Sequence, residues 1–203
     1  MSADKPRLLL LDIGMVLIEL NFNPLAKTLH SLSGIAPAQL QQVLTGEGLI
    51  QKYETGQIEA AAFHQEVCRR IGADIPWPAF LDAWNSVFDK PLIPDEVLAA
   101  AARKSRLWAI SNTNKLHFDY MLRHFKFLRY FEGFVLSHEV GMLKPDAGIF
   151  LRALERAQEP ASAVLFVDDQ EANVRAARDL GIESLQFLSP SQLAAELTAR
   201  GLL

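Results

Sequence analysis

The chain has little of what marks secreted, nucleic-acid-binding or membrane-spanning proteins. Its 203 residues include a single cysteine, Cys68, so no disulfide can form within the chain and we expect a reducing, cytoplasmic setting. The formal net charge is −4, and without clustered Lys and Arg we expect neither nucleic acid nor an anionic membrane surface as a partner. No apolar run approaches the roughly 18 residues that span a bilayer. These shortages favour a soluble cytoplasmic protein.

What the chain does have is enough apolar sequence for a folded core. Half of its residues are hydrophobic and 22% are charged, a balance that excludes extensive disorder. A chain of this length forms one domain, with room for a smaller second one.

Five short apolar runs, each ending in polar residues or a polar turn, indicate buried strands. Runs of about four to six residues with little alternation are typical of strands covered on both faces, as in a parallel sheet. The runs are LLLLD (8–12), LWAIS (107–111), FVLS (134–137), VLFVDD (164–169) and ESLQF (183–187). Because helical patterns separate them, we expect an α/β fold, a Rossmann-like parallel sheet flanked by helices.

The helices of this core have recognisable ends. Apolar residues recur at helical spacing over 146–157 and 171–181, with Asp146 near the first start and Gly181 at the second stop. Ser189-Pro190 opens a last helix, because proline suits the first helical turn.

Residues 18–95 have a different pattern. Helical periodicity dominates them, strand signals are few, and several prolines punctuate the far end. We therefore expect a discontinuous α/β core domain, residues 1–17 and 96–203, with a small helical cap domain, residues 18–95, inserted after the first strand.

A lone carboxylate, Asp12, follows the first apolar run, where an uncompensated charge would be costly. Three further polar groups come at or after the ends of expected strands: Ser111-Asn112, Lys144 and Asp168-Asp169. Ligands of parallel sheets bind beyond the carboxyl ends of the strands. Carboxylates, a lysine and hydroxyl and amide donors suit a phosphate ester held with Mg²⁺. Each of these motifs alone is typical of a turn or a helix cap. The prediction of a phosphate site therefore depends on finding all four of them at strand ends.

At this point the sequence resembles the haloacid dehalogenase-like hydrolase superfamily over nearly its whole length. The motifs are DIG (12–14), SN (111–112), KPD (144–146) and DDQEAN (168–173), in the family's order. YETGQIE (53–59) and FLDAWNSVF (80–88) are similar to the helical cap of the branch that includes sugar-phosphate phosphatases of the glucose-1-phosphate type.

The resemblance implies a role for each matching residue. Asp12 would be the nucleophile that forms an aspartyl-phosphate, and Lys144 would stabilise charge on both Asp12 and the phosphate. Ser111 and the backbone of Asn112 would bind the phosphoryl group. The Mg²⁺ ligands would be Asp12, the backbone carbonyl of Gly14, Asp169 directly and Asp168 through water, with Asn173 supporting that shell.

One position departs from most phosphatases of the superfamily, which carry a second aspartate, the general acid–base, where this chain has Gly14. Losing such a group lowers the rate of the reaction by roughly 10²–10⁴-fold. The loss is smallest for substrates whose leaving group departs easily without a proton. The resembled branch shares the glycine, although Met15 stands where that branch often has a small or polar residue. We therefore expect a phosphoric monoester hydrolase acting on small phosphorylated metabolites, in particular sugar phosphates such as aldose 1-phosphates.

Two alternatives stay open at this level. A haloacid dehalogenase would use Asp12 to attack carbon and also lacks the second aspartate, but it would not need the metal pair Asp168-Asp169. A catalytically feeble protein that binds a phosphate ligand or a partner is consistent with Gly14, though such a protein has no need of Asp12. The oligomeric state is not predicted.

Overall fold

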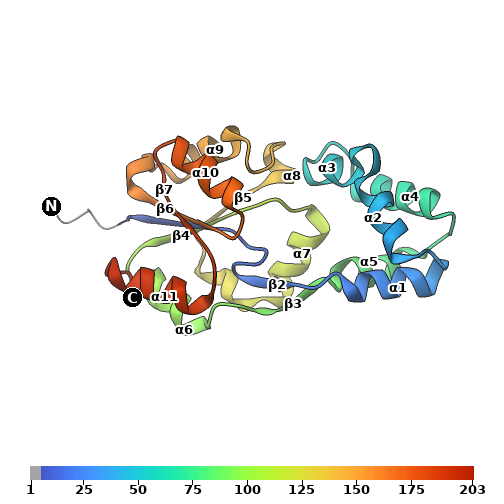
Figure 1. The fold of residues 1–203 in the computed structure, drawn as a ribbon, viewed down its shortest axis with the longest axis horizontal. Coiled ribbons are helices and arrows are strands. Elements are labelled where there is room, and N and C mark those ends of the chain that lie inside the picture. Colours follow the sequence, from blue (N-terminus) through green and yellow to red (C-terminus); the bar gives the residue numbers. More distant parts are fainter. Residues whose placement is uncertain (1–5) are drawn as a thin grey trace.

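A five-stranded parallel sheet forms the centre of the computed structural model, which describes residues 6–203 (Figure 1). Its order is β5-β4-β1-β6-β7, and every neighbouring pair runs parallel. The strands are β1 (Leu8–Leu11), β4 (Arg106–Ser111), β5 (Gly133–Leu136), β6 (Val164–Asp168) and β7 (Glu183–Gln186). The predicted fold class is confirmed, and each strand lies on its apolar run.

Helices cover both faces of the sheet, which explains why the strand sequences are apolar without alternation. Leu9 and Leu11 of β1 pack toward α6 (Asp95–Ala102), α7 (Lys115–His124) and α11 (Pro190–Ala199). Leu8 and Leu10 pack toward α9 (Ala147–Ala157) and the last turns of α10 (Glu171–Asp179). Figure 1 shows α9 and α10 on one side of the sheet and α6 and α11 on the other.

The core helices begin at the polar residues that the sequence indicates. The side chain of Asp146 accepts a hydrogen bond from the backbone N–H of Gly148 at the start of α9. The hydroxyl of Ser189 accepts one from the N–H of Gln192 at the start of α11. These caps satisfy N–H groups that would otherwise lack partners.

Five helices between β1 and β4 form a second group, here called the helical unit, at the other end of the molecule (Figure 1). They are α1 (Asn23–Ser33), α2 (Pro37–Thr45), α3 (Leu49–Glu54), α4 (Ala60–Ile71) and α5 (Trp77–Asn85). The helical unit has its own hydrophobic cluster, in which Phe63 contacts the rings of Tyr53 and Trp84. Leu116 of α7 packs against this cluster, so the helical unit is in contact with the core.

The ends of the 18–95 region are extended rather than helical. β2 (Ile18–Leu20) and β3 (Phe88–Pro91) pair antiparallel, where the chain enters and leaves the helical unit. Strands of three and four residues are too short to show a period of two, which explains why the sequence carries few signs of them. Short elements complete the fold: α8 (Ser137–Val140) and the 3₁₀ turns Gly46–Gly48, Lys126–Tyr130 and Ala161–Ala163.

No helix between residues 6 and 203 combines the length and the apolar composition that a membrane crossing requires.

The turn after β1 holds a non-glycine residue in the left-handed region. Met15 has φ +58°, and its N–H donates to the carbonyl of Ile18, 2.8 Å away. The N–H groups of Leu17 and Ile18 both donate to the carbonyl of Ile13. Backbone hydrogen bonds therefore fix a conformation that costs an L side chain about 1–2 kcal/mol.

Met15→Gly is expected to stabilise the protein by about 0.5–1 kcal/mol, because relief of the left-handed strain exceeds the extra entropy of glycine in the unfolded chain. Urea unfolding measures the free energy difference. Met15→Ala, which keeps the Cβ atom, should show no such gain. An equal gain in both variants would trace the effect to the long side chain instead of the backbone.

Candidate active site

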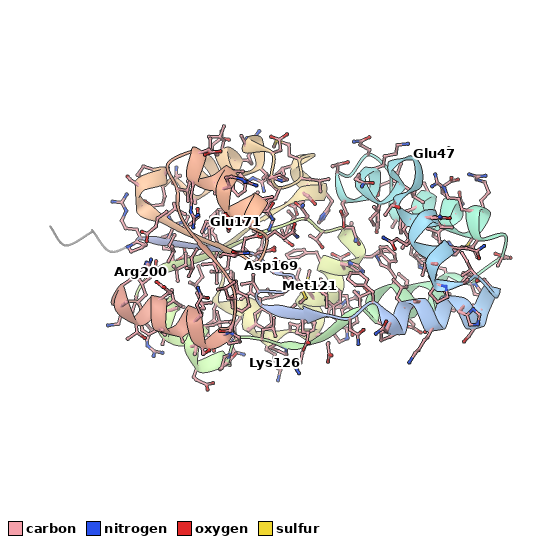
Figure 2. All side chains as sticks on the ribbon, viewed as in Figure 1. Glu47, Met121, Lys126, Asp169, Glu171 and Arg200 are labelled. Carbon is pink, nitrogen blue, oxygen red and sulfur yellow. The ribbon has the colours of Figure 1, made fainter. Side chains whose placement is uncertain are left out.

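The central strands bring the predicted site residues together at one edge of the sheet. Asp12 follows β1, Ser111 ends β4 and Asp168 ends β6, and these three strands are neighbours. Lys144 reaches them from the loop between α8 and α9: its Nζ lies 2.7 Å from Oδ1 of Asp12 and 2.7 Å from Oδ2 of Asp168. Asp169 lies in the middle of the molecule, where the sheet faces the helical unit (Figure 2). Residues that are far apart in sequence therefore form one charged cluster.

The cluster is buried and has an excess of negative charge. Asp12, Lys144 and Asp168 expose 6%, 5% and 0% of their surfaces. Oxygen atoms of Asp12, Asp168 and Asp169 all lie within 4.8 Å of one another, against the single ammonium group of Lys144. Such an arrangement of carboxylate oxygens is the kind of donor set that Mg²⁺ takes.

The three carboxylates differ in how many of their oxygens are already bound. Asp168 accepts from Lys144 on Oδ2, and from the backbone of Gln170 and Nδ2 of Asn173 on Oδ1, at 2.8 and 2.9 Å. Asp12 uses Oδ1 for both Lys144 and the N–H of Ile13. Within the described part of the chain, Oδ2 of Asp12 has no hydrogen-bond donor and is open to a ligand, whereas both oxygens of Asp168 already accept hydrogen bonds.

The pKa values of the cluster reflect burial and mutual repulsion. Burial raises the pKa of Asp12 to about 7; Lys144 opposes this rise and Asp168 adds to it. Burial and then Asp168 raise the pKa of Asp169. Burial lowers the pKa of Lys144, but the two carboxylates outweigh it and the net pKa is raised. A cation bound here would relieve the repulsion among the acids.

Asn112 positions Lys144, a role that the sequence did not indicate. Its Nδ2 donates to the carbonyl of Lys144 at 2.9 Å, and its Oδ1 accepts from the N–H of Lys144 at 2.7 Å. This reciprocal pair ties the lysine loop to the end of β4. The two residues are 32 positions apart, and no spacing rule connects them.

A cavity of about 590 Å³ lies between the sheet edge and the helical unit. Ser111, Asn112 and Gly14 line one side of it, and the rest of the lining comes from α1, α2, α3 and α5, from α7 and from the β2–β3 pair. Asp12 does not line it, but the next residue, Ile13, does, so the cavity adjoins the charged cluster. Most of the lining is apolar, and a ligand that reached from the cluster into the cavity would lose its contact with water.

His117 joins the helical unit to the core. Its Nδ1 lies 3.1 Å from Nδ2 of Asn114, and its Nε2 lies 3.0 Å from the carbonyl of Trp84. Because an amide donates to Nδ1, Nε2 carries the proton and donates to the carbonyl. Burial lowers the pKa of His117 to about 4, so the ring is neutral at physiological pH. Its hydrogen bonds indicate a packing role beside the cavity.

The chain is similar to a known family and to several curated proteins. The family model of haloacid dehalogenase-like hydrolases matches residues 28–181. A D-ribitol-5-phosphate phosphatase of Bacteroides thetaiotaomicron is 24% identical over 92% of this chain and 94% of its own length. A drimenol cyclase of Aspergillus calidoustus is 34% identical, but the match spans 46% of this chain and only 18% of the cyclase.

Solved structures resemble the whole chain. A HAD family enzyme from Bacteroides thetaiotaomicron, in complex with magnesium and inorganic phosphate, has a TM-score of 0.81 and 26% identity, covering 91% of this chain and 95% of its own. A predicted HAD-like hydrolase from Porphyromonas gingivalis has a TM-score of 0.83 at 24% identity, covering 96% and 97%. A 2-haloacid dehalogenase from Pseudomonas syringae shares the fold at a TM-score of 0.63 and 18% identity, covering 97% and 99%.

Proposed function

The chain belongs to the haloacid dehalogenase-like hydrolase family, and from this premise we propose that it is a Mg²⁺-dependent phosphatase of small phosphorylated metabolites. The observation that carries the proposal is the buried cluster, in which Lys144 bridges Asp12 and Asp168 beside Asp169. A ribitol-phosphate phosphatase among the relatives, and a similar structure that binds magnesium and phosphate, support it.

The residues present fit a magnesium ion. Asp12, Asp169 and the backbone carbonyl of Gly14 would hold it, with Asp168, whose two oxygens already accept three hydrogen bonds, acting through water. When bound, the ion supplies positive charge for the phosphoryl oxygens and for the carboxylates around it.

The chain's own groups then divide the work of phosphoryl transfer. One oxygen of Asp12 attacks phosphorus, the bond to the leaving alkoxide breaks, and water later hydrolyses the aspartyl-phosphate. Ser111 and Asn112 line the cavity, and the hydroxyl of Ser111 and the N–H of Asn112 bind the phosphoryl oxygens. Lys144 neutralises charge on Asp12 and on the phosphoryl group, and Asn112 holds Lys144 in place.

We assign residues 18–95 as the cap and residues 1–17 and 96–203 as the core. The contacts of Leu116 and His117 with the helical unit, and the share of the cavity lining that this unit contributes, support the assignment. In this proposal the cap excludes water and meets the leaving group. Position 14 carries no general acid, so protonation of the leaving group depends on groups elsewhere in the cavity. Aldose 1-phosphates need this protonation least, because their hemiacetal oxygen leaves more easily than an alkoxide, and we propose them as the preferred substrates.

A phosphate-release screen over sugar phosphates, polyol phosphates, nucleotides and acyl phosphates tests the proposal. We expect release with Mg²⁺ and a fall of at least about 10²-fold in kcat/KM after EDTA, because the metal provides several kcal/mol of charge stabilisation. Re-added Mg²⁺ is the control. Halide release from a 2-haloacid in the presence of EDTA would instead identify a dehalogenase, and absence of turnover of every ester would identify a binding protein.

A further inference from the structure

Position 14, on the side of the cavity next to Asp12, is a glycine and offers no side chain that could donate a proton. A Cβ atom at Gly14 would lie 3.0 Å from Cδ1 of Leu20, so the space that an acid would fill there is apolar. Proton transfer to a poor leaving group must then come from elsewhere in the cavity.

Glu54, the last residue of α3, is the one acidic side chain among the residues that line this cavity. The other titratable group that lines it is His117, which is held between Asn114 and Trp84. In residues 6–203 the carboxyl group of Glu54 forms no hydrogen bond and no ion pair, so it is unengaged and faces a largely apolar space.

Close contacts place this end of α3 beside the phosphoryl-binding strand end. A Cβ atom at Gly56, two residues after Glu54, would lie only 2.3 Å from the carbonyl oxygen of His138. The Nδ1 of His138 lies 3.2 Å from the carbonyl of Thr113, which also accepts from the hydroxyl of Ser137. Thr113 directly follows Ser111-Asn112 and lines the same cavity. Only glycine allows this close approach of α3 to α8.

The charged groups around Glu54 are engaged with other partners. Burial raises the pKa of Glu54 to about 7, with no charged neighbour contributing. The elements that pack against α3 are α2, α4, α8 and the turn Gly46–Gly48. Their titratable side chains, with their partners, are Glu47 and Glu66 with Arg70, Arg69 with Glu66, Glu139 with Arg156, His64 with the carbonyl of Ile75, Cys68 with His64, and His138 with the carbonyl of Thr113. On α3 itself Lys52 is exposed, and the ring of Tyr53 stacks on Phe63.

We propose that Glu54 is the general acid that this cavity presents to the leaving group of the substrate, in place of the acid missing at position 14. The inference rests on the proposed phosphatase function. As the bond from Asp12 to phosphorus forms and the ester bond breaks, the carboxyl proton of Glu54 passes to the departing oxygen and an alcohol leaves. The Glu54 carboxylate then takes a proton from the water that hydrolyses the aspartyl-phosphate, which restores the acid.

The test compares Glu54→Gln with wild type on two esters, ribitol 5-phosphate and p-nitrophenyl phosphate. A primary alkoxide needs protonation to leave, so kcat/KM for ribitol 5-phosphate should fall about 10²-fold. p-Nitrophenolate leaves without a proton, so its release should change less than about twofold.

The pH profile gives a second measurement. Wild-type activity on ribitol 5-phosphate should decline above pH about 7, where Glu54 loses its proton, and the activity of the Glu54→Gln variant should not show this decline. Glu59→Gln, an exposed glutamate outside the cavity, is the matched control.

Other outcomes overturn the assignment. Equal losses on both esters would mean that Glu54 only supports the fold, and unchanged kinetics on both would mean that it takes no part. A rise in KM for ribitol 5-phosphate at constant kcat would reduce it to a binding group. If wild type hydrolyses neither ester nor any compound of the phosphate screen, the proposed function itself fails, a result distinct from all of these.

A stability measurement checks the protonation state without any substrate. Burial raises the folded pKa of Glu54 from its ordinary value of 4.5 to about 7, so stability is lost as the pH rises between these two values and the full penalty of the charged form is present above pH about 7. Glu54→Gln should therefore raise Tm at pH 8 and leave it unchanged at pH 4. Equal Tm differences at both pH values would contradict a buried, protonated Glu54.

Discussion

Turnover of phosphate esters by the Asp12→Asn variant is expected to fall by a factor of at least about 10⁴, because an amide cannot form the aspartyl-phosphate. The side chain keeps its shape, and its amide oxygen can still accept from Lys144 Nζ and the N–H of Ile13, which now bond Oδ1. The fold should therefore survive while the chemistry is lost. Single-turnover phosphate release, together with a thermal unfolding scan, separates the two effects.

Asp179→Asn is a suitable control, since Asp179 is exposed at the end of α10 and away from the cluster. It should retain wild-type turnover. Mg²⁺-dependent release by pure Asp12→Asn at more than about a tenth of the wild-type rate would remove Asp12 from the role of nucleophile and return the assignment to another group in the site.

Lys144→Met is expected to destabilise the metal-free protein by about 3–5 kcal/mol at pH 8. The change removes the one cation that is hydrogen-bonded to two almost fully buried carboxylates, and an uncompensated buried charge carries this penalty. Urea unfolding in EDTA measures it. The penalty should shrink toward pH 4, because without Lys144 the pKa of Asp12, already raised by burial, rises further and protonation removes the buried charge.

A double-mutant cycle with Asp12→Asn makes the prediction specific to the ion pair. Lys144→Met should cost less in the Asp12→Asn background, because one of the two stranded carboxylates is already neutral. Additive losses in the double variant would show that Lys144 is not coupled to Asp12 and would contradict the ion pair between them. The activity of Lys144→Met should also fall, since charge on Asp12 and on the phosphoryl group would go unneutralised.

Rules that connect sequence to topology were enough to predict the fold and the convergence of the charged residues. Asp12 and Lys144 are separated by most of the chain, but both follow strands of one parallel sheet, and such strand ends meet at one edge. The β1 and β6 runs were recognisable because burial on both faces leaves an unbroken apolar sequence.

Other features of the site depend on contacts that no sequence period encodes. The sequence indicated a role only for the backbone of Asn112. Its side chain, however, forms two hydrogen bonds with the backbone of Lys144 and so holds the loop that carries this lysine. Glu54 lies in a polar stretch of a helix and looks like any surface glutamate until the fold places it over a cavity. Both roles arise from tertiary packing, which cannot be predicted from secondary-structure propensities or from the spacing of residue types along the sequence.

The antiparallel pair β2–β3 has a consequence for how this molecule could have been assembled. Leu20 lies opposite Phe88, so residues 21–87 leave the core and return to it at adjacent points, about 5 Å apart. A short hairpin turn could bridge those points without moving β1 or β4. The segment between them is therefore a module that recombination can exchange or resize while Asp12, Lys144 and Asp168 keep their places at the sheet edge, and only the groups that it contributes to the cavity, Glu54 among them, would change with it.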